Sequence, residues 1–250
     1  MNPYISKLDT NRFGFPIAKI DTFDRPIDQT ISELKKDGVK LVISKLSLTD
    51  FDLINELEGA GFRLKDTQLT HFYDVSKRHE SLKQFFTPDA VIKTWYQNVP
   101  EKLKIQVVDL ARKAFVGHGH YFANKRLDHL KCIEIYEDWA SRSCTEKSAA
   151  DVMFTIEIGD DLAGFGTLRI FDGPNGKYSV GTLGAVSEQY RMKNIYKMLV
   201  VKSIFWAAEN NIIREEYSAL TTNYGVNRAL ESLGFKLQHH FATFHLWLDN

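Results

Sequence analysis

The sequence predicts an α/β fold with a mixed, mostly antiparallel sheet flanked by helices, preceded by a smaller α/β half-domain. Three observations predict it. Strand and helix signals alternate over residues 1–76, three strands follow one another over residues 152–186, and a helix, a strand, a second helix and a last strand complete the chain. With 250 residues, of which 44% are hydrophobic, the chain can bury a substantial core.

The N-terminal unit is predicted over residues 1–76. The segment "RFGFPIAKID" has strand-like aromatic and β-branched content. "PIDQTISELKKDG" begins with Pro26 and an acid and ends at Gly38, as expected for a helix. "VKLVISKL" then predicts a strand, "TDFDLINELEGAG" a helix capped by Thr49 or Asp50, and "FRLKDTQLTHFYDV" one or two strands.

The larger domain is predicted over residues 101–250, after a connection at residues 77–100 with little regular structure. "EKLKIQVVDLARKAF" has apolar residues at the spacing of one helix face, and "LDHLKCIEIYEDWASRS" predicts a second helix after the loop "GHGHYFANKR". "DVMFTIEIG" alternates apolar and polar positions, which is typical of a half-buried strand. Turn residues lead from it to "LAGFGTLRIF" and then to "KYSVGTLGAV", so three antiparallel strands precede residue 187.

The C-terminal elements show an internal similarity to the N-terminal unit. "NIYKMLVVKSIFWAAENN" is apolar on most sides and predicts a helix packed against a sheet. "EEYSALTT" predicts a strand, "NYGVNRALESLG" a helix that ends at Gly234, and "FKLQHHFATFHLWL" the last strand or pair. Gly61 aligns with Gly234 and Phe62 with Phe235 at a constant offset of 173, which indicates an internal repeat, although any helix followed by Gly-Phe and a strand gives a similar pattern.

Charge and cysteine content restrict the classes of partner. Thirty-two Lys and Arg balance 32 Asp and Glu, so the field that a nucleic-acid or anionic-membrane binder uses is missing. The two cysteines form no CxxC motif, and no apolar run is long enough to cross a bilayer. We therefore expect a cytoplasmic protein whose partners are small molecules or protein, with no nucleic acid and no membrane; a homodimer is compatible with the sequence.

Two motifs give a resemblance to a known family. "VSEQYRMKNIY" lies where the GNAT superfamily of acyl-CoA N-acyltransferases has a V-x-x-x-x-[QR]-x-x-G-x-[GA] loop, and "NYGVNRALESLGF" matches that family's N-x-x-[AV]-x-x-x-[Y]-x-x-x-G-F except at the tyrosine. The resemblance covers residues 101–250. With the N-terminal half and the aromatic loop "GHYFANKRL", the chain is similar to the dTDP-fucosamine acetyltransferase group of nucleotide-amino-sugar enzymes.

The resemblance implies an N-acetyltransferase with acetyl-CoA as co-substrate and no metal. It implies transfer of acetyl to a small amine, most concretely the amino group of a dTDP-linked deoxyamino sugar, by direct attack in a ternary complex. An amino acid, peptide or polyamine acceptor keeps the same fold. The departures from the motifs leave a third reading open, in which the GNAT fold serves as a binding or interaction module.

The loop at residues 190–196 is the predicted CoA phosphate site. Amide groups at a helix N-terminus lack intrahelical partners and face anions favourably, and Arg191 and Lys193 add charge-assisted bonds. Where such loops favour Gly or Ala, this chain has Met192, Asn194 and Tyr196. Asn tolerates a positive φ, Met can point away, and Tyr adds bulk. The predicted cofactor contacts are Ala185, Val186, Arg191, Met192, Lys193, Asn194, Ile195, Tyr196 and Asn223.

Residues for proton transfer are less clearly marked. The resemblance places the family's leaving-group tyrosine at Leu230, which cannot donate a proton, and Tyr224 is a weak substitute. Candidate bases for the amine are His120, Glu157 and His245. The loop residues predicted to contact the acceptor are His118, Tyr121, Phe122 and Arg126. His118 and His120 form an HxH pair that no third ligand completes, and the acidic runs "EIYED" and "REE" are expected to be solvated faces.

Overall fold

The computed structural model describes residues 2–77 and 80–248. Their contacts divide the chain into two compact units. Unit 1 contains the residues up to Gln68, the segment Gly117–Cys132 and the residues from His239 onward, and unit 2 contains Leu69–Val116 and Ile133–Gln238. Each unit therefore takes segments that are far apart in the sequence, whereas the predicted boundaries at 76 and 101 divide the chain consecutively.

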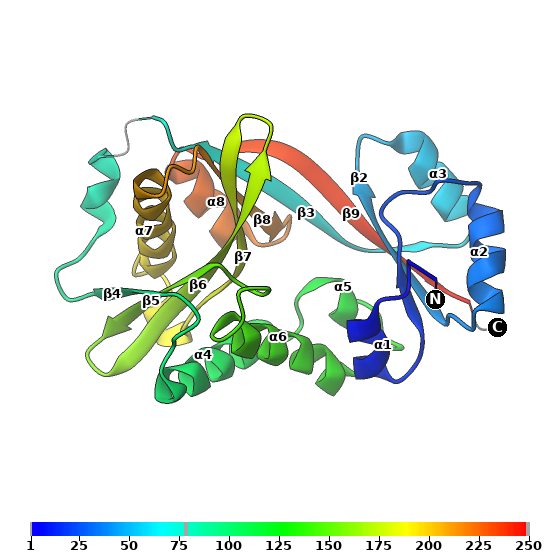
Figure 1. Cartoon of the computed structure of the whole chain (residues 1–250), viewed down its shortest axis with the longest axis horizontal. Coiled ribbons are helices and arrows are strands. Elements are labelled where there is room, and N and C mark those ends of the chain that lie inside the picture. Colours follow the sequence, from blue (N-terminus) through cyan, green and yellow to red (C-terminus); the bar gives the residue numbers. More distant parts are fainter. Residues whose placement is uncertain (1, 78–79, 249–250) are drawn as a thin grey trace. The chain divides into compact units, whose positions relative to one another are not determined.

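The described residues contain one nine-stranded mixed sheet, which confirms the predicted fold class. The strand order is β1-β2-β9-β3-β8-β7-β6-β5-β4, with parallel pairing at β1–β2 and β7–β8 (Figure 1). The strands are β1 (Ile17–Lys19), β2 (Leu41–Ser47), β3 (Arg63–Asp74), β4 (Val91–Trp95), β5 (Val152–Ile158), β6 (Asp161–Gly173), β7 (Gly176–Val186), β8 (Arg214–Leu220) and β9 (Lys236–Trp247).

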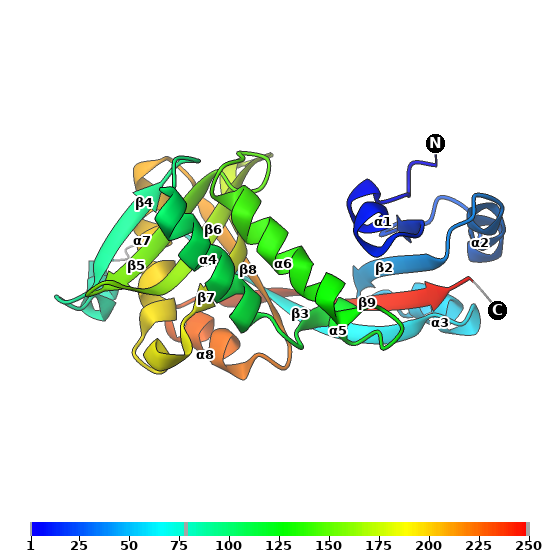
Figure 2. The same cartoon turned by 90° about the horizontal axis from the view of Figure 1, so that it is seen from below.

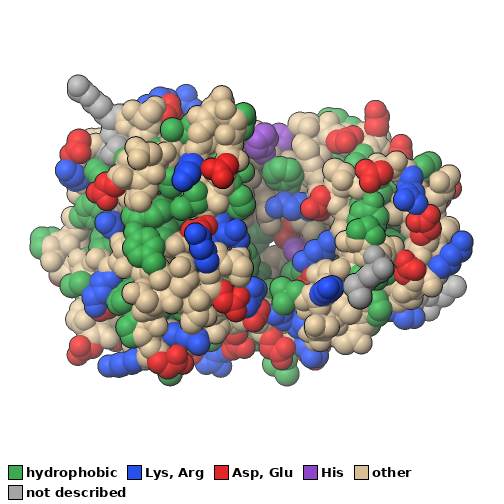
Figure 3. Space-filling view, viewed as in Figure 1, with side chains coloured by type: hydrophobic (Ala, Val, Ile, Leu, Met, Phe, Trp, Pro, Cys, Tyr) green, Lys and Arg blue, Asp and Glu red, His purple; other side chains and the backbone are tan. Residues whose placement is uncertain are grey.

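The helices connect these strands. They are α1 (Lys7–Phe13), α2 (Ile27–Lys36), α3 (Phe51–Gly59), α4 (Glu101–Ala114), α5 (Gly119–Phe122), α6 (His129–Ser143), α7 (Ile195–Glu209) and α8 (Tyr224–Ser232), with short 3₁₀ turns at Glu80–Phe85 (η1) and Glu188–Tyr190 (η2). No helix in the described ranges is long and apolar enough to span a membrane. Lys and Arg are interspersed with Asp and Glu over the face seen in Figure 3, as the balanced composition predicts.

Unit 2 has helices on both faces of its strands. On one face α7 and α8 bury Leu199, Ile204 and Leu230 against β5, β6 and the end of β3. On the other face α4 and α6 bury residues such as Val107 and Ala140 against Phe165 of β6 (Figure 2). α7 is covered on most sides, which confirms the prediction that this apolar helix packs against the sheet.

Unit 1 is built on β2, which pairs in parallel with β1 and antiparallel with β9. The β2–β9 register runs from Leu41 opposite Trp247 to Ser47 opposite Phe241. A core of apolar side chains joins these strands to α2 and α3, with Leu57 and Phe62 fully buried.

Two parts of the sequence form structure that was not predicted. Residues 7–13 form α1, in which Ser6 accepts a hydrogen bond from the Asp9 amide and Gly14 ends the helix at φ 80°. The segment 77–100 contains β4 and η1, so the expected lack of regular structure is wrong there. β4 pairs with β5 as an edge strand, opposite Met153–Glu157. The segments expected to hold one or two strands each form a single strand, β3 and β9.

The internal similarity extends to three consecutive elements. The bounds of β2, α3 and β3 become those of β8, α8 and β9 when 173 is added to each residue number. The caps also correspond, because the side chain of Asp50 accepts from the amide of Leu53 and that of Asn223 accepts from the amide of Val226, each at 3.2 Å. We therefore call β2-α3-β3 the first repeat and β8-α8-β9 the second repeat.

Candidate active site

β7 and β8 pair over only part of their lengths. Their parallel register runs from Tyr178 opposite Arg214 to Gly181 opposite Tyr217, while β7 continues to Val186. We call the divergence beyond the Gly181–Tyr217 pair the fork. β7 carries one extra residue here, since Thr167 of β6 lies opposite Leu183 and the next residue of β6 lies opposite Gly181. A bulge of this kind bends a strand, and so accounts for the fork.

The bulge is held by the side chain of Thr167. Its hydroxyl donates to the carbonyl of Leu183 at 2.9 Å and accepts from the amide of Leu183 at 3.0 Å. It also lies 2.9 Å from the hydroxyl of Thr182, the extra residue of β7. The strand is therefore fixed where it leaves β8.

Beyond the bulge, alternate backbone groups of β7 face the fork. The amide of Ser187 donates to the carbonyl of Ala163 of β6. Because the groups of an antiparallel ladder alternate, the amide and carbonyl of Ala185 also point toward β6, and those of Gly184 and Val186 point away from it. Of the two predicted contacts, Val186 thus presents its backbone to the fork. Ala185 does not, and Gly184 takes its place.

The loop after β7 begins with a turn anchored by Asp161. The carboxylate of Asp161 accepts hydrogen bonds from the side-chain amide of Gln189 and the hydroxyl of Tyr190, each at 3.0 Å. The Lys193 ammonium lies 5.0 Å from the centre of the Tyr190 ring, and Arg191 is exposed. Both predicted cations therefore lie on the accessible part of the loop.

The loop keeps the backbone shape of a glycine loop without its glycines. Met192 has φ 64° and Asn194 has φ 60°, in the left-handed region that favours glycine. For methionine this conformation costs roughly 1–2 kcal/mol. The Met192 side chain is 99% exposed, so it points away from the protein as the sequence suggested. Strain of this kind is typical of ligand-binding segments.

Four consecutive amides at the start of α7 are available to a ligand. The first intrahelical acceptor is the carbonyl of Asn194, which accepts from Met198. Within the described ranges, the amides of residues 194–197 donate to no acceptor, and the side chain of Asn194 does not cap the helix. With Arg191 and Lys193 next to them, these amides have the donors and the charge that a pyrophosphate needs.

Tyr196 leaves these amides free. Its ring packs against the buried core beneath α7, where burial, and to a smaller extent the charge of Glu215, raise the pKa of its hydroxyl. The Tyr196 ring, which the sequence suggested would crowd the phosphate site, is therefore directed into the core.

Substitutions at Met192 should show whether the loop needs its positive φ. Met192→Gly should keep or increase the affinity for acetyl-CoA, because glycine adopts this conformation without strain. Met192→Val should lower it, since a β-branched residue disfavours a positive φ more strongly than methionine does. Isothermal titration calorimetry with acetyl-CoA measures both, and a valine variant that binds as tightly as the native protein would show that the φ is irrelevant.

The second repeat supplies the other predicted contacts of the site. Asn223 caps α8 through its side-chain oxygen, which leaves the amide nitrogen as a donor. Leu230 is fully buried in the core, so nothing at this position can protonate a thiolate. Tyr224 is 67% exposed at the first turn of α8.

A buried carboxylate lies behind the fork, and the sequence did not predict it. Glu215 of β8 is fully buried, so the expected solvated face at "REE" is wrong for this residue. Its carboxylate contacts the hydroxyl of Ser203 at 2.5 Å and that of Ser179 at 3.3 Å. Burial raises its pKa to about 7, against smaller opposing effects of hydrogen bonds from Ser203, Tyr217 and Ser179. Because side chains alternate between the two faces of a strand, Glu215 and Tyr217 lie on the same face of β8. This alternation was the signal in the sequence that could have indicated a buried Glu215.

The predicted bases His120 and His245 lie together in unit 1. Nδ1 of His120 and Nε2 of His245 are 2.9 Å apart, and Nδ1 of His245 is 2.8 Å from the amide nitrogen of Asn124. The oxygen of Asn124 accepts from the indole of Trp247 and the amide of Arg126, so its nitrogen must donate to His245. His245 then donates to His120, whose outer nitrogen carries a proton.

This arrangement keeps both histidines neutral. Burial, with smaller effects of nearby lysines, lowers the pKa of His120 to about 3, and burial, with the adjacent His120 and lysines, lowers that of His245 to about 2. The accepting nitrogen of each ring is already used. His120 therefore presents a donor, and this tautomer disfavours its predicted role as a base.

The loop residues predicted to contact the acceptor also belong to unit 1. The buried Tyr121 donates its hydroxyl to Asp9 at 2.9 Å and stacks on Phe13. The Arg126 guanidinium lies 3.9 Å from the centre of the Trp247 ring, Phe122 contacts His129, and His118 is exposed at the start of α5. Tyr121 thus has a structural role, and the other three remain predicted contacts.

The remaining candidates give no alternative chemistry. Glu157, at the end of β5, pairs with Lys93 at 2.8 Å. Cys132 and Cys144 are buried and unpaired, and burial raises the pKa of both thiols to about 11, so neither is a ready nucleophile. No group of three or more potential metal ligands gathers among residues 2–77 and 80–248.

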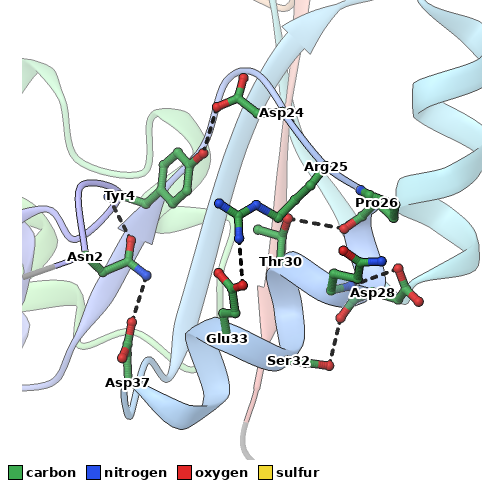
Figure 4. A network of polar contacts seen from close by, with 11 residues as sticks. Asn2, Tyr4, Asp24, Arg25, Pro26, Asp28, Thr30, Ser32, Glu33 and Asp37 are labelled. Atoms are coloured by element: carbon green, nitrogen blue, oxygen red, sulfur yellow. Dashed lines mark hydrogen bonds and ion pairs between the residues drawn. The ribbon is translucent and has the colours of Figure 1, made fainter.

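In unit 1, the chain leading into α2 differs from the loop before α7. Seven residues, Ile20–Pro26, link β1 to α2. Asp24 accepts from the hydroxyl of Tyr4, Arg25 pairs with Glu33 at 2.6 Å, and Asp28 lies in the first turn of the helix (Figure 4). Carboxylates at a helix N-terminus oppose a bound phosphate. Of these two segments, only the loop before α7 in unit 2 is thus compatible with a phosphate.

Comparisons with solved structures identify the fold. A tandem GNAT protein from the clavulanic acid biosynthesis pathway, solved without acetyl-CoA, superposes with a TM-score of 0.68 at 12% identity, over 95% of this chain and 77% of that one. A GCN5-related N-acetyltransferase from Kribbella flavida gives 0.57 at 10% identity over 92% and 80% of the two chains, and one from Sphaerobacter thermophilus gives 0.56 at 11% identity over 84% and 60%.

The chain therefore has the GNAT fold, and the match to a tandem GNAT protein extends over both repeats. No protein-family model matches the sequence, and the curated proteins give no match. The similarity to the dTDP-fucosamine acetyltransferase group stays a prediction.

Proposed function

We propose that this protein is an acetyl-CoA-dependent N-acetyltransferase whose co-substrate binds unit 2. The observation that carries the proposal is the combination of the fork with the loop before α7. The fork opens one edge of β7 to an extended ligand, and the loop offers four free amides and two cations to its phosphates. The positive φ of Met192 and Asn194 supports the same conclusion, because strained backbone conformations occur mainly at ligand-binding and active sites.

Each part of the site has a distinct role in this proposal. Arg191, Lys193 and the amides of residues 194–197 bind the diphosphate of CoA. The backbone of Gly184 and Val186 and the side-chain amide of Asn223 bind the pantetheine arm along the fork. These contacts orient the thioester at the Gly181–Tyr217 end of the fork, where an amine attacks its carbonyl carbon.

Arg191→Ala should weaken acetyl-CoA binding by about tenfold, because one charge-assisted hydrogen bond is lost. Folding should be unaffected, since the side chain is exposed. The measurement is the rise in melting temperature with acetyl-CoA concentration, which reports binding to the native state. Lys177→Ala, which removes an exposed cation of β7 before its pairing with β8 begins, is the matched control and should bind like the native protein.

The enzymatic proposal is tested by following free thiol with acetyl-CoA and three amines: dTDP-fucosamine, spermidine and L-lysine. Thiol release above background with one of them supports an acetyltransferase. Binding of acetyl-CoA with no thiol release would instead favour a binding module built on the GNAT fold. Absence of binding at millimolar acetyl-CoA would contradict the co-substrate site itself.

A dTDP-linked amino sugar is the acceptor that the sequence resemblance favours. Saturation-transfer NMR with dTDP separates this acceptor from a polyamine or an amino acid. Signal transfer to the thymine protons supports the nucleotide sugar, and its absence favours the other amines.

A further inference from the structure

The proposed transfer needs a group that removes a proton from the attacking amine. The predicted bases do not offer one, because Glu157 is paired with Lys93 and the outer nitrogen of His120 is a donor. The buried polar cluster behind the fork does. It consists of Ser179 on β7, Ser203 on α7, and Glu215 and Tyr217 on β8.

Tyr217 is the member of this cluster that reaches the fork. Its ring lies directly on Gly181, where an added Cβ atom would be 2.2 Å from the ring, and it is partly exposed. Its hydroxyl is 2.9 Å from the hydroxyl of Ser203, and as a hydrogen-bond donor it opposes the rise in the pKa of Glu215. Ser203, Ser179 and Glu215 are all buried behind it.

The hydrogen bonds of the cluster can be satisfied in both protonation states of Glu215. When Glu215 is protonated, its carboxyl donates to Ser203, and Ser203 donates to the carbonyl of Val200, 2.7 Å away. When Glu215 is ionised, the hydroxyls of Ser203, Ser179 and Tyr217 turn to donate to it. In both states Tyr217 directs its proton inward, so one lone pair of its oxygen is not used within the cluster.

We infer that Glu215 accepts the proton of the attacking amine through Tyr217, which makes Tyr217 a catalytic residue of the fork and Ser203 a positioning residue. This inference rests on the proposed acetyltransferase function. As the C–N bond forms, the nitrogen gives a proton to the oxygen of Tyr217, and Tyr217 gives its own proton to the Glu215 carboxylate. The C–S bond breaks with its electron pair on sulfur. Glu215 then returns the proton by the same path to the thiolate, so the relay is restored.

The surroundings of Glu215 suit this role. The titratable groups that face it are Tyr73 of β3, Tyr196 of α7 and Tyr217, and in each of them the charge of Glu215 raises the pKa of the hydroxyl. Within the described residues no Lys, Arg or His pairs with its carboxylate. A carboxylate without a cation, held by hydroxyl donors alone, gains and loses a proton near neutral pH.

The test compares Glu215→Gln and Tyr217→Phe with the native protein and with Glu216→Gln. Glu216 is the control because it is the next residue of the same strand and pairs with Arg214 at 2.7 Å instead of joining the cluster. The rate with the fastest of the three amines named above should fall on the order of 100-fold or more in Glu215→Gln and Tyr217→Phe, as expected for loss of a general base. The rise of kcat/KM through neutral pH should disappear in Glu215→Gln, and Glu216→Gln should keep it.

A second readout needs no turnover. In protein labelled with ¹³C at the glutamate carboxyl carbon, one signal that is missing from Glu215→Gln should titrate near pH 7. Tyr217→Phe should move that titration to higher pH, because it removes a donor to the ionised form. A Glu215 signal that titrates in the ordinary range, or one that does not respond to Tyr217→Phe, overturns the inference.

The two levels of proposal fail in different ways. If the native protein binds acetyl-CoA but releases no thiol, the acetyltransferase function fails, and the relay fails with it. If the native protein is active and Glu215→Gln keeps its rate and pH profile, only the relay fails. Acetyl-CoA titrations of melting temperature for every variant show whether a lost rate comes from lost folding or binding instead.

Discussion

Acidification from pH 7 to pH 5 should destabilise unit 1, with a loss of about 2 kcal/mol for each of His120 and His245. The pKa of His120 is lowered to about 3 and that of His245 to about 2, from an ordinary value of 6.5. Below pH 6.5 these two histidines therefore bind protons in the unfolded chain but stay neutral in the native chain. The free energy of unfolding falls from pH 6.5 downward, until the native histidines are protonated as well.

The variant His245→Gln isolates this effect. The glutamine oxygen can accept from Asn124 and its nitrogen can donate to His120, so the hydrogen bonds survive without the titration at position 245. We expect this variant to be less stable than the native protein at pH 7, because a smaller side chain fills a buried site. Its loss of stability between pH 7 and pH 5 should be about half that of the native protein.

Hydrogen exchange of the β2 and β9 amides, measured at both pH values, reports the opening of unit 1. Equal pH dependence in the native protein and in His245→Gln would show that His245 is not a source of acid sensitivity.

Gly181→Ala should destabilise the protein by roughly 2–4 kcal/mol, as expected for overpacking together with a lost buried hydrogen bond. The added methyl group would lie 2.2 Å from one ring atom of Tyr217 and 2.3 Å from another. The ring must move, and its bond to Ser203 then breaks. The same variant should lose acetyltransferase activity if Tyr217 acts as inferred.

Gly166→Ala on the neighbouring strand is the matched control. The nearest atom to an added methyl group there is the Cβ of Leu199 at 3.9 Å, an ordinary contact. Replacing glycine in a strand by alanine is otherwise favourable by roughly 0.5–1 kcal/mol, so this variant should be as stable as the native protein or more so. Urea unfolding of both variants gives the comparison, and equal stability of the two would contradict close packing of Tyr217 on Gly181.

The fold could be predicted where local chemistry determines structure. The Asn223 cap and Gly234 mark the ends of α8, and alternation of apolar residues marks β5, because these signals lie within a few residues of the element. α1 was missed because its seven residues are too few for a periodic pattern. β4 was missed because its residues are half-exposed or exposed at the edge of the sheet, where no alternation is required.

The candidate site was predictable only where one segment builds it. The loop from Arg191 to Tyr196 is continuous, and the behaviour of Met192 and Asn194 follows from the conformation that a phosphate loop needs. Glu215 could not be recognised, because what makes it unusual is the pair of serines that distant elements bring to it. His120 looked like an exposed base for the same reason, since its partner His245 is 125 residues away in the sequence.

The pairing of β2 with β9 has a consequence for the order in which the chain becomes structured. β2 begins at Leu41, yet its partner opposite that residue is Trp247, 206 residues further along the chain. During synthesis the first repeat emerges with one edge of β2 unpaired, and it stays so until β9 has been made. Closing this ladder is a long-range event with a high entropy cost. Folding of unit 1 is therefore expected to be slow and to wait for the synthesis of β9, with β2 an exposed edge that a chaperone or a second nascent chain could occupy in the meantime.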